Sequence, residues 1–173
     1  MNLELDGKVA LVVGATGRRP LELVCDSTRP VETAAAVRTV VALLGGLDAL
    51  VNSVGAAKGG HFLELSGADA LPELRVRRGV IVNVIGHRGK QPDGKALPAG
   101  VANAGLMNFT IGLAREEAKH GVRVVGVDPA PVETRRLEAV FETEARVPGV
   151  SVNEARRRWL SHVPLGRAAT AAR

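Results

Sequence analysis

Four short runs of apolar residues, rich in β-branched side chains, recur along this chain. They are VALVV at 9–13, LDALV at 47–51, VIVNV at 80–84 and VRVVGV at 122–127. Continuous apolar runs of this length are typical of strands that are buried on both faces, as in a parallel sheet between helices. A weaker run, LELV at 21–24, predicts a fifth strand. The chain is therefore expected to fold around a buried β-sheet.

The segments between these runs have the periodicity of amphipathic helices. The segment at 31–46 repeats apolar residues at i, i+3, i+4 and i+7 and ends at a pair of glycines. Residues 101–120 repeat this spacing with Leu106, Phe109 and Leu113 on one face. Strands that alternate with helices predict an α/β fold with a mostly parallel sheet. The charged segment at 135–159 is expected to be a helical flap.

Composition limits the class of protein. The 173 residues are 46% hydrophobic, which is enough for one domain, and the single cysteine, Cys25, excludes an internal disulfide. Apolar runs stay below the length of about 18 residues that a membrane span needs, and acidic residues near the N-terminus argue against a secretion signal. A cytoplasmic protein is expected. The formal net charge is +5, but its basic clusters are short, so neither nucleic acid nor membrane is expected as a partner.

The spacing of the first two apolar runs conflicts with a complete α/β unit. Parallel neighbours need a crossover of about a dozen residues, usually a helix, whereas only GATGRRP separates Val13 from Leu21. Either these two runs are not parallel neighbours, or the natural polypeptide has residues there that this sequence lacks. Pro72 raises the same question further along, because proline is expected to interrupt the next crossover helix.

Five stretches carry a resemblance. They are GKVALVVGATG, CDSTRP, GGLDALVNSVG, GVIVNVIG and LAREEAKHGVRVVGVDPAPVET, in this order along the chain. Together they resemble successive landmarks of the short-chain dehydrogenase/reductase family, and the resemblance covers nearly the whole chain. It implies a Rossmann-like, doubly wound, mostly parallel sheet with helices on both faces, in a single domain at 1–173. Because members of this family are usually longer, further segments are expected after Gly17, after Ala70 and beyond Arg173.

The resemblance also implies an activity. It implies an oxidoreductase that uses NAD or NADP and acts on a small carbonyl compound or alcohol. A Gly-rich turn after the first strand agrees with this, because Gly14, Thr16 and Gly17 would let backbone amides approach a pyrophosphate. The family pattern would continue with glycines where this chain has Arg18 and Pro20, and the alternative interpretation is a tight turn without a ligand.

Further cofactor-binding residues follow from the resemblance. It places Asp26 toward the adenine ring, Asn52 and Gly55 at the adenine-ribose wall, and Pro129, Val132 and Thr134 near the nicotinamide carboxamide. All of them follow apolar runs, and ligands of open α/β sheets bind at the carboxyl ends of strands. Asn52 has a structural alternative, because its side chain could instead cap the end of its own strand.

The usual catalytic residues of the family are not found. Aligned without gaps, the Ser, Tyr and Lys positions fall on Gly86, Ala99 and Asn103, and the chain contains no tyrosine. Asn103 could still hydrogen bond to the nicotinamide ribose. His87 and Lys95 are further candidates for proton transfer, because histidine titrates near neutrality and the pKa of a desolvated lysine falls toward it. The alternative for both is a solvent-exposed loop charge.

Two functional hypotheses therefore remain open. The first is an active NAD(P)-dependent oxidoreductase, and the second is a catalytically impaired cofactor-binding or structural subunit of the same fold. A homo-oligomer, a dimer or a tetramer, is expected in either case, because the face formed by Leu106, Phe109 and Leu113 resembles the family's dimer helix. The same face could instead pack only against its own sheet. No metal site is expected.

Overall fold

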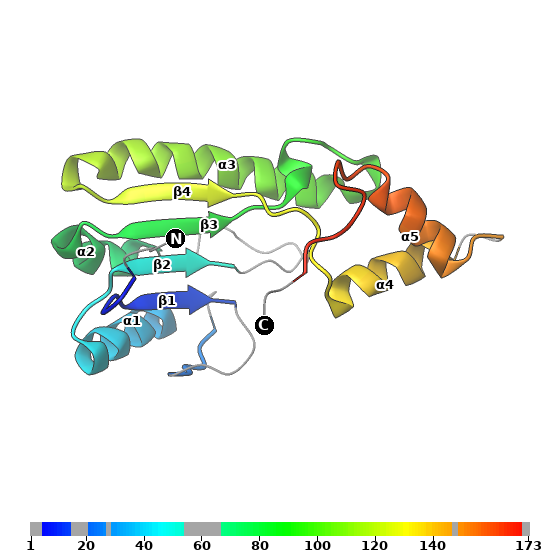
Figure 1. The fold of residues 1–173 in the computed structure, drawn as a ribbon. Helices are drawn as coiled ribbons and strands as arrows, with labels where there is room; N and C mark the ends of the chain where they lie inside the picture. The colour runs from blue at the N-terminus through cyan, green and yellow to red at the C-terminus, as the bar shows by residue number, and fades with distance from the viewer. Residues whose placement is uncertain (1–4, 15–20, 27–28, 54–66, 147–148, 171–173) are drawn as a thin grey trace. The chain divides into compact units, whose positions relative to one another are not determined.

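The computed structural model describes residues 5–14, 21–26, 29–53, 67–146 and 149–170 (Figure 1). The chain forms two compact units, Met1–Asp128 and Pro129–Arg173. Thr16, Gly17 and Gly55, which the sequence assigns to the cofactor, lie outside the described residues. The expectation of a single domain stays a prediction.

The first unit contains a parallel sheet whose strands follow the order of the sequence. These strands are β1 (Ala10–Val13), β2 (Ala49–Asn52), β3 (Val80–Val84) and β4 (Arg123–Val127). They pair in the order β1-β2-β3-β4, and each pairing is parallel (Figure 1). Each of the four main apolar runs therefore supplies one strand, as the sequence predicts.

The prediction of a fifth strand at 21–24 is wrong. The backbone there is neither strand nor helix, although the half-buried Leu23 packs against the core of the sheet. The reason is the short spacing between the first two apolar runs. A link as short as the one between Val13 and Leu21 cannot carry a crossover to a parallel neighbour, so this run contributes a side chain to the core without joining the sheet.

Helices connect the strands of the first unit. They are α1 (Pro30–Leu44), α2 (Gly67–Arg77) and α3 (Leu97–Glu117), with short 3₁₀ turns η2 (His87–Gly89), η3 (Gly94–Ala96) and η4 (Ala118–His120). α1 ends where the sequence predicts, because Gly45 adopts a left-handed conformation with φ of 77° that side chains rarely tolerate. α3 begins four residues earlier than expected, with a proline in its first turn.

The expected interruption at Pro72 does not occur. α2 runs through this proline from Gly67 to Arg77. Proline in a helix removes one backbone hydrogen bond and crowds the preceding turn. That cost is offset here by burial on the same helix, because Ala70 and Leu74 have no solvent exposure and belong to the main core.

The helices of the first unit share one core on one face of the sheet. Leu50, Ile81 and Val124 lie side by side in register on β2, β3 and β4. These residues cluster with Val37 and Val40 of α1, with Ala70 and Leu74 of α2, and with Leu113 and Ala114 of α3. On the opposite face of β4, Val125 is 44% exposed. The described residues thus cover one of the two faces that the sequence analysis expects to be covered.

Strand order explains why these helices share a face. Crossovers between parallel strands are almost always right-handed, so successive crossovers that advance in one direction place their helices on the same side. β1 to β4 advance in one direction throughout. Helices on the second face would need strands on the other side of β1, and the described part of the chain contains none.

A buried ion pair joins α2 to α3. Glu117 is 1% exposed, and its carboxylate accepts hydrogen bonds from Nε and Nη2 of Arg75 at 2.8 and 2.6 Å. These charge-assisted hydrogen bonds hold the pKa of Glu117 below its ordinary value of 4.5, although burial opposes them.

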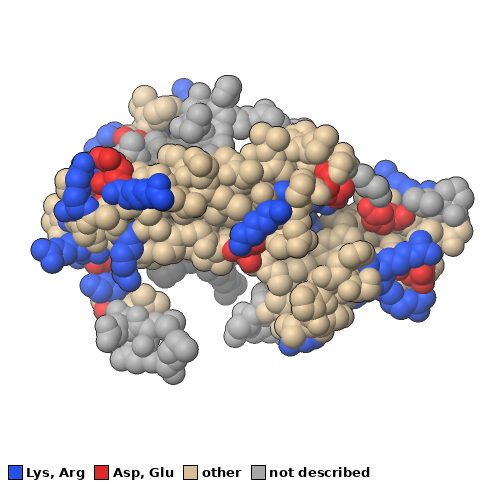
Figure 2. All heavy atoms as spheres, turned by 90° about the horizontal axis from the view of Figure 1, so that it is seen from above, with Lys and Arg blue, Asp and Glu red and all other residues tan. Residues whose placement is uncertain are grey.

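Elsewhere, charges of both signs are interspersed on the face shown in Figure 2, where Lys and Arg lie among Asp and Glu.

The second unit has its own small core. Its helices are α4 (Arg135–Glu144) and α5 (Val152–Leu160), which agrees with the helical flap expected for this segment. Phe141 has no solvent exposure, and its ring meets that of Trp159 edge to face with centroids 6.0 Å apart. The Arg156 guanidinium lies 5.6 Å from the centre of the Phe141 ring. Within the described residues, no helix is long and apolar enough to cross a membrane.

Candidate functional site

The carboxyl ends of β1, β2 and β3 form one aligned edge. Val13, Asn52 and Asn83 are register partners across these strands. Gly14 follows β1 directly, is exposed, and has a φ of 80°, a left-handed conformation that favours glycine. An exposed glycine turn at the carboxyl edge lets the backbone approach a pyrophosphate, so the described residues fit a dinucleotide at this edge.

Asn52 belongs to a hydrogen-bonded chain beneath this edge. Its Nδ2 donates to Oδ1 of Asn83 at 2.9 Å, and Nδ2 of Asn83 donates to the Thr110 hydroxyl at 3.0 Å. The hydroxyl in turn donates to the Leu106 carbonyl within α3 at 2.7 Å. Asn83 and Thr110 are buried, so their polar groups need these partners. Asn52 thus ties β2 to β3 in addition to its predicted place beside the cofactor.

The three positions that replace the family's catalytic residues lie together. Oδ1 of Asn103 accepts a hydrogen bond from the backbone N–H of Gly86, and its Nδ2 donates to the Ala99 carbonyl at 2.7 Å. Asn103 therefore joins the other two positions by hydrogen bonds. These bonds give Asn103 a structural task, because its amide holds the loop after β3 against α3. The predicted bond from Asn103 to a nicotinamide ribose stays a prediction.

The substitutions at these positions depend on one another. A Cβ at Gly86 would lie 3.0 Å from both side-chain amide atoms of Asn103. The family's serine therefore does not fit at position 86 unless the Asn103 amide moves. The Asn103 amide thus occupies the space next to position 86, and only a residue as small as glycine fits there without moving it.

A histidine and a carboxylate meet at the next positions along this edge. His87 opens η2 after β3, Asp128 follows β4, and Nδ1 of His87 lies 2.9 Å from Oδ2 of Asp128. The hydrogen bond to Asp128 raises the pKa of His87 above 6.5, and a side-chain hydrogen bond to Gln91 raises it further. The His87 side chain is 57% exposed, while Oδ1 of Asp128 is buried and accepts no hydrogen bond from the described residues.

The structure gives less information on two other predicted site residues of the first unit, Lys95 and Asp26. Lys95 lies in η3, within the loop between β3 and α3, and only its backbone is described. Asp26 follows the irregular segment at 21–25, not the strand that the sequence predicts. Its backbone N–H donates to Oε2 of Glu32 in the first turn of α1 at 2.9 Å. The roles predicted for both side chains stay predictions.

The remaining predicted cofactor residues lie in the second unit. Pro129 is exposed, and Val132 forms an isolated parallel bridge with Ala169. Thr134 is the N-cap of α4, where its hydroxyl accepts the backbone N–H of Leu137 at 3.3 Å. Capping occupies the hydroxyl that the resemblance assigns to the nicotinamide carboxamide. Whether these residues also bind the cofactor stays a prediction.

The cap at Thr134 gives a testable prediction. Replacing Thr134 with alanine is expected to lower the stability of the second unit by about 1 kcal/mol, because the first turn of α4 loses its side-chain acceptor. The measurement is urea unfolding followed by the fluorescence of Trp159, the only tryptophan of the chain. Thr143→Ala is the control, since that hydroxyl only donates back to the Ala139 carbonyl within α4. Equal losses in both variants would contradict the capping role.

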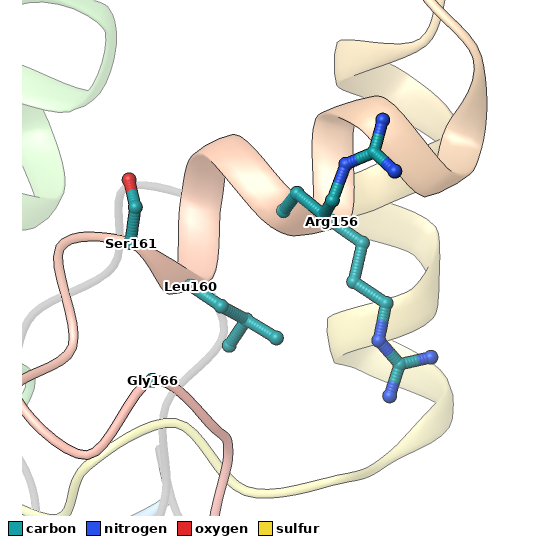
Figure 3. Close-up of a pocket in the computed structure, with 5 residues that line it drawn as sticks. Arg156, Leu160, Ser161 and Gly166 are labelled. Atoms are coloured by element: carbon teal, nitrogen blue, oxygen red, sulfur yellow. The ribbon is translucent and has the colours of Figure 1, made fainter.

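A pocket of about 280 Å³ lies in the second unit. It is lined by Arg156, Arg157, Leu160, Ser161 and Gly166 (Figure 3). Its charges are already matched, because Arg156 pairs with Glu133 and Glu138, and Arg157 pairs with Glu154. The Ser161 side chain points away from Leu160 in Figure 3 and donates to the Arg158 carbonyl. Nothing in this pocket identifies a ligand.

Comparison with known proteins identifies the family. The sequence profile of the family described as short chain dehydrogenase matches residues 66–145. A ketoacyl reductase named for the granaticin polyketide synthase of Streptomyces violaceoruber is 32% identical over 165 residues, which cover 83% of this chain and 61% of that protein. This chain belongs to the short-chain dehydrogenase/reductase family. The resemblance found in the sequence is thereby confirmed.

Two further members of the family extend this comparison. The 3-oxoacyl-[acyl-carrier-protein] reductase FabG of Vibrio cholerae is 25% identical over 219 residues, covering 95% of this chain and 85% of that protein. The crystal structure of an actinorhodin polyketide ketoreductase variant with NADPH superposes with a TM-score of 0.68 at 30% identity, over 84% of this chain and 64% of that one. The Rossmann-like α/β fold is confirmed.

This chain is shorter than its relatives in the short-chain dehydrogenase/reductase family. It spans 61% of the length of the granaticin-synthase reductase. The match to the Vibrio reductase extends over 219 residues, more than the 173 of this chain, so that relative has residues opposite gaps in this sequence. The expectation of further segments after Gly17, after Ala70 and beyond Arg173 stays a prediction.

Two features of the site were not predicted from the sequence: the pairing of His87 with Asp128 and the hydrogen bonds of Asn83. A signal existed for Asn83, because it is the one polar residue in the run VIVNV, and a polar residue in a buried strand needs a partner. The His87–Asp128 pair had no such signal. The two residues meet only because β3 and β4 are neighbours in register, which spacing along the sequence does not reveal.

Proposed function

We propose that this chain binds a nicotinamide dinucleotide at the carboxyl edge of its sheet and acts as an NAD(P)-dependent oxidoreductase on a small carbonyl compound or alcohol. The observation that carries the proposal is the aligned edge of β1, β2 and β3, with the exposed left-handed Gly14 directly after β1. Membership of the short-chain dehydrogenase/reductase family supports it, as does the NADPH in the related ketoreductase structure.

The proposed binding residues follow the sequence prediction. Gly14, Thr16 and Gly17 would receive the pyrophosphate, Asp26, Asn52 and Gly55 the adenosine part, and Pro129, Val132 and Thr134 the nicotinamide part. A bound nicotinamide ring would supply or accept the hydride. The residues of this chain would bind and orient it, and a titratable side chain would exchange the proton with the substrate oxygen.

A second candidate function is supported by one observation. The Asn103 amide makes hydrogen bonds to the backbone of Gly86 and of Ala99. At the positions of the usual catalytic residues, this side chain therefore binds the protein itself. This favours a catalytically impaired cofactor-binding or structural subunit of the same fold. In either case we propose a cytoplasmic protein that forms a homo-oligomer, as the family resemblance implies.

A thermal melt tests dinucleotide binding. Unfolding is followed by circular dichroism with and without NADH or NADPH. A ligand present at about 100 times its dissociation constant stabilises the folded state by about 2.7 kcal/mol, so a raised melting temperature with one of the two is expected. A melting temperature unchanged by either dinucleotide would contradict the oxidoreductase and favour the structural subunit.

Turnover separates the two candidates. The probe is a short ketoacyl thioester, chosen because the relatives are named ketoacyl or oxoacyl reductases. Oxidation of the bound dinucleotide by this probe supports the oxidoreductase. A dinucleotide that binds and is not oxidised supports the impaired subunit.

A further inference from the structure

His87 lies next to the place where the family's catalytic residues would stand. It follows Gly86, whose N–H is held by Asn103, and Asn103 also reaches Ala99. His87 is therefore the next residue along the chain after the position that the alignment assigns to the family's serine.

The backbone around His87 is fixed on several sides. The N–H of Ile85 donates to the Val127 carbonyl at 2.8 Å, which ties the end of β3 to β4. The N–H of Lys90 donates to the His87 carbonyl at 2.9 Å within the turn. A Cβ at Gly89 would lie 2.8 Å from the backbone of Asn103, so η2 packs closely against α3. The imidazole of His87 is thus carried by a turn, η2, whose backbone is held by hydrogen bonds and by close packing against α3.

Asp128 orients the imidazole. Its Oδ2 lies 2.9 Å from Nδ1 of His87, so this ring nitrogen carries the proton that is donated to the carboxylate. The other ring nitrogen, Nε2, is then the one that can exchange a proton with a substrate. A histidine fixed by a carboxylate at one nitrogen and active at the other is the arrangement used for general acid–base catalysis.

The charges around His87 favour its protonated form. Asp128 faces it from the end of β4, and Gln91 hydrogen bonds to the ring from the same loop, and both raise its pKa. Lys90 opposes them and lowers the pKa. The part of α3 packed against η2 contributes Gly100, Asn103 and Ala104, which do not titrate. A raised histidine pKa suits a proton donor more than a proton acceptor.

We propose that His87, positioned by Asp128, is the general acid that protonates the substrate oxygen during carbonyl reduction. The inference rests on the proposed dinucleotide-dependent activity and names the residue that replaces the family's tyrosine. Asp128 is a positioning residue, since it acts through the imidazole.

The step balances in atoms and electrons. The carbonyl carbon gains a hydride from a reduced nicotinamide dinucleotide, and the carbonyl oxygen takes a proton from Nε2 of the His87 imidazolium. The carbonyl compound is reduced to an alcohol and the dinucleotide is oxidised. The imidazole is left neutral and regains its proton from solvent.

Substitution of His87 tests the proposal by activity. His87→Gln is expected to lower kcat/KM for reduction of the thioester probe by about 100-fold, with dinucleotide binding unchanged. The side chain is largely exposed, so the variant is expected to fold. His162→Gln is the matched control, because His162 is an exposed histidine of the second unit. Asp128→Asn is expected to shift the alkaline fall of kcat/KM to lower pH, since it removes the charge that favours the imidazolium.

Nuclear magnetic resonance gives a readout that does not need turnover. The imidazole signals are titrated in the chain without cofactor and assigned by their loss in His87→Gln. The pKa of His87 is expected above 6.5, and Asp128→Asn is expected to lower it. Addition of oxidised dinucleotide is expected to shift the His87 signal and to leave the His162 signal in place.

The outcomes distinguish this inference from the proposed function. If no dinucleotide binds to the wild-type chain, the proposed function fails and this inference fails with it. If dinucleotide binds while His87→Gln reduces the probe at the wild-type rate, the inference about His87 alone is overturned. A His87 signal that dinucleotide leaves unchanged, or a pKa that Asp128→Asn leaves unchanged, also overturns it.

Discussion

Replacing Ile81 with alanine is expected to lower the free energy of unfolding of the first unit by about 3 kcal/mol, because it opens a cavity in a packed core. Ile81 is 1% exposed and lies at the centre of the cluster that α1, α2 and α3 form on the sheet. The measurement is urea unfolding of the wild type and the variant, followed by circular dichroism.

The opposite face of the sheet supplies the control for this prediction. Val125 lies on β4, next in sequence to Val124, and points away from the shared core because side chains alternate along a strand. It is 44% exposed, so Val125→Ala is expected to cost less than about 0.5 kcal/mol. Equal losses for Ile81→Ala and Val125→Ala would contradict a core confined to the face that the helices cover.

Replacing Glu117 with glutamine is expected to cost about 2 kcal/mol, because charge-assisted hydrogen bonds to a guanidinium are lost inside the protein. The carboxylate is 2% exposed and joins α3 to Arg75 of α2. The control is Glu116→Gln at the neighbouring residue, whose carboxylate is 65% exposed and pairs with Lys119. That change is expected to leave stability unaltered, so similar losses in the two variants would contradict the account.

The ion pair also predicts a pH dependence with a definite sign. The folded-state pKa of Glu117 lies below 4.5, so its contribution to stability is fully present well above that pH and is lost as pH falls through the folded pKa. The difference in unfolding free energy between the wild type and Glu117→Gln is therefore expected to stay constant near neutral pH and to shrink below about pH 4.5. A difference that does not change with pH would contradict it.

The four strands and the end of α1 could be predicted from the sequence for physical reasons. A parallel strand covered by helices is apolar along most of its length, so β1 to β4 lie in largely apolar runs such as VALVV. Gly45 ends α1 because glycine reaches the left-handed conformation that closes a helix. These are local signals, and the run at 21–24 shows their limit, since it has strand-like residues and no room for a crossover.

The candidate site could be predicted only in part. The ungapped alignment brings Gly86, Ala99 and Asn103 to one place, and the structure places them within hydrogen-bonding distance through Asn103. The partner of His87 could not be found from the sequence, because Asp128 is 41 residues away and meets it only through the pairing of β3 with β4. Contacts set by strand neighbours need the sheet order, which spacing alone does not give.

Titration of NADH or NADPH fluorescence with the purified chain shows whether the carboxyl edge of this sheet binds a nicotinamide dinucleotide. We expect saturable binding of at least one of the two. We also expect weaker binding to Gly14→Val at an unchanged circular dichroism spectrum, because a side chain at this left-handed, exposed turn strains it and blocks the approach of the pyrophosphate. Absence of saturable binding of both dinucleotides to the wild-type chain, or equal binding to wild type and Gly14→Val, would contradict binding at this edge.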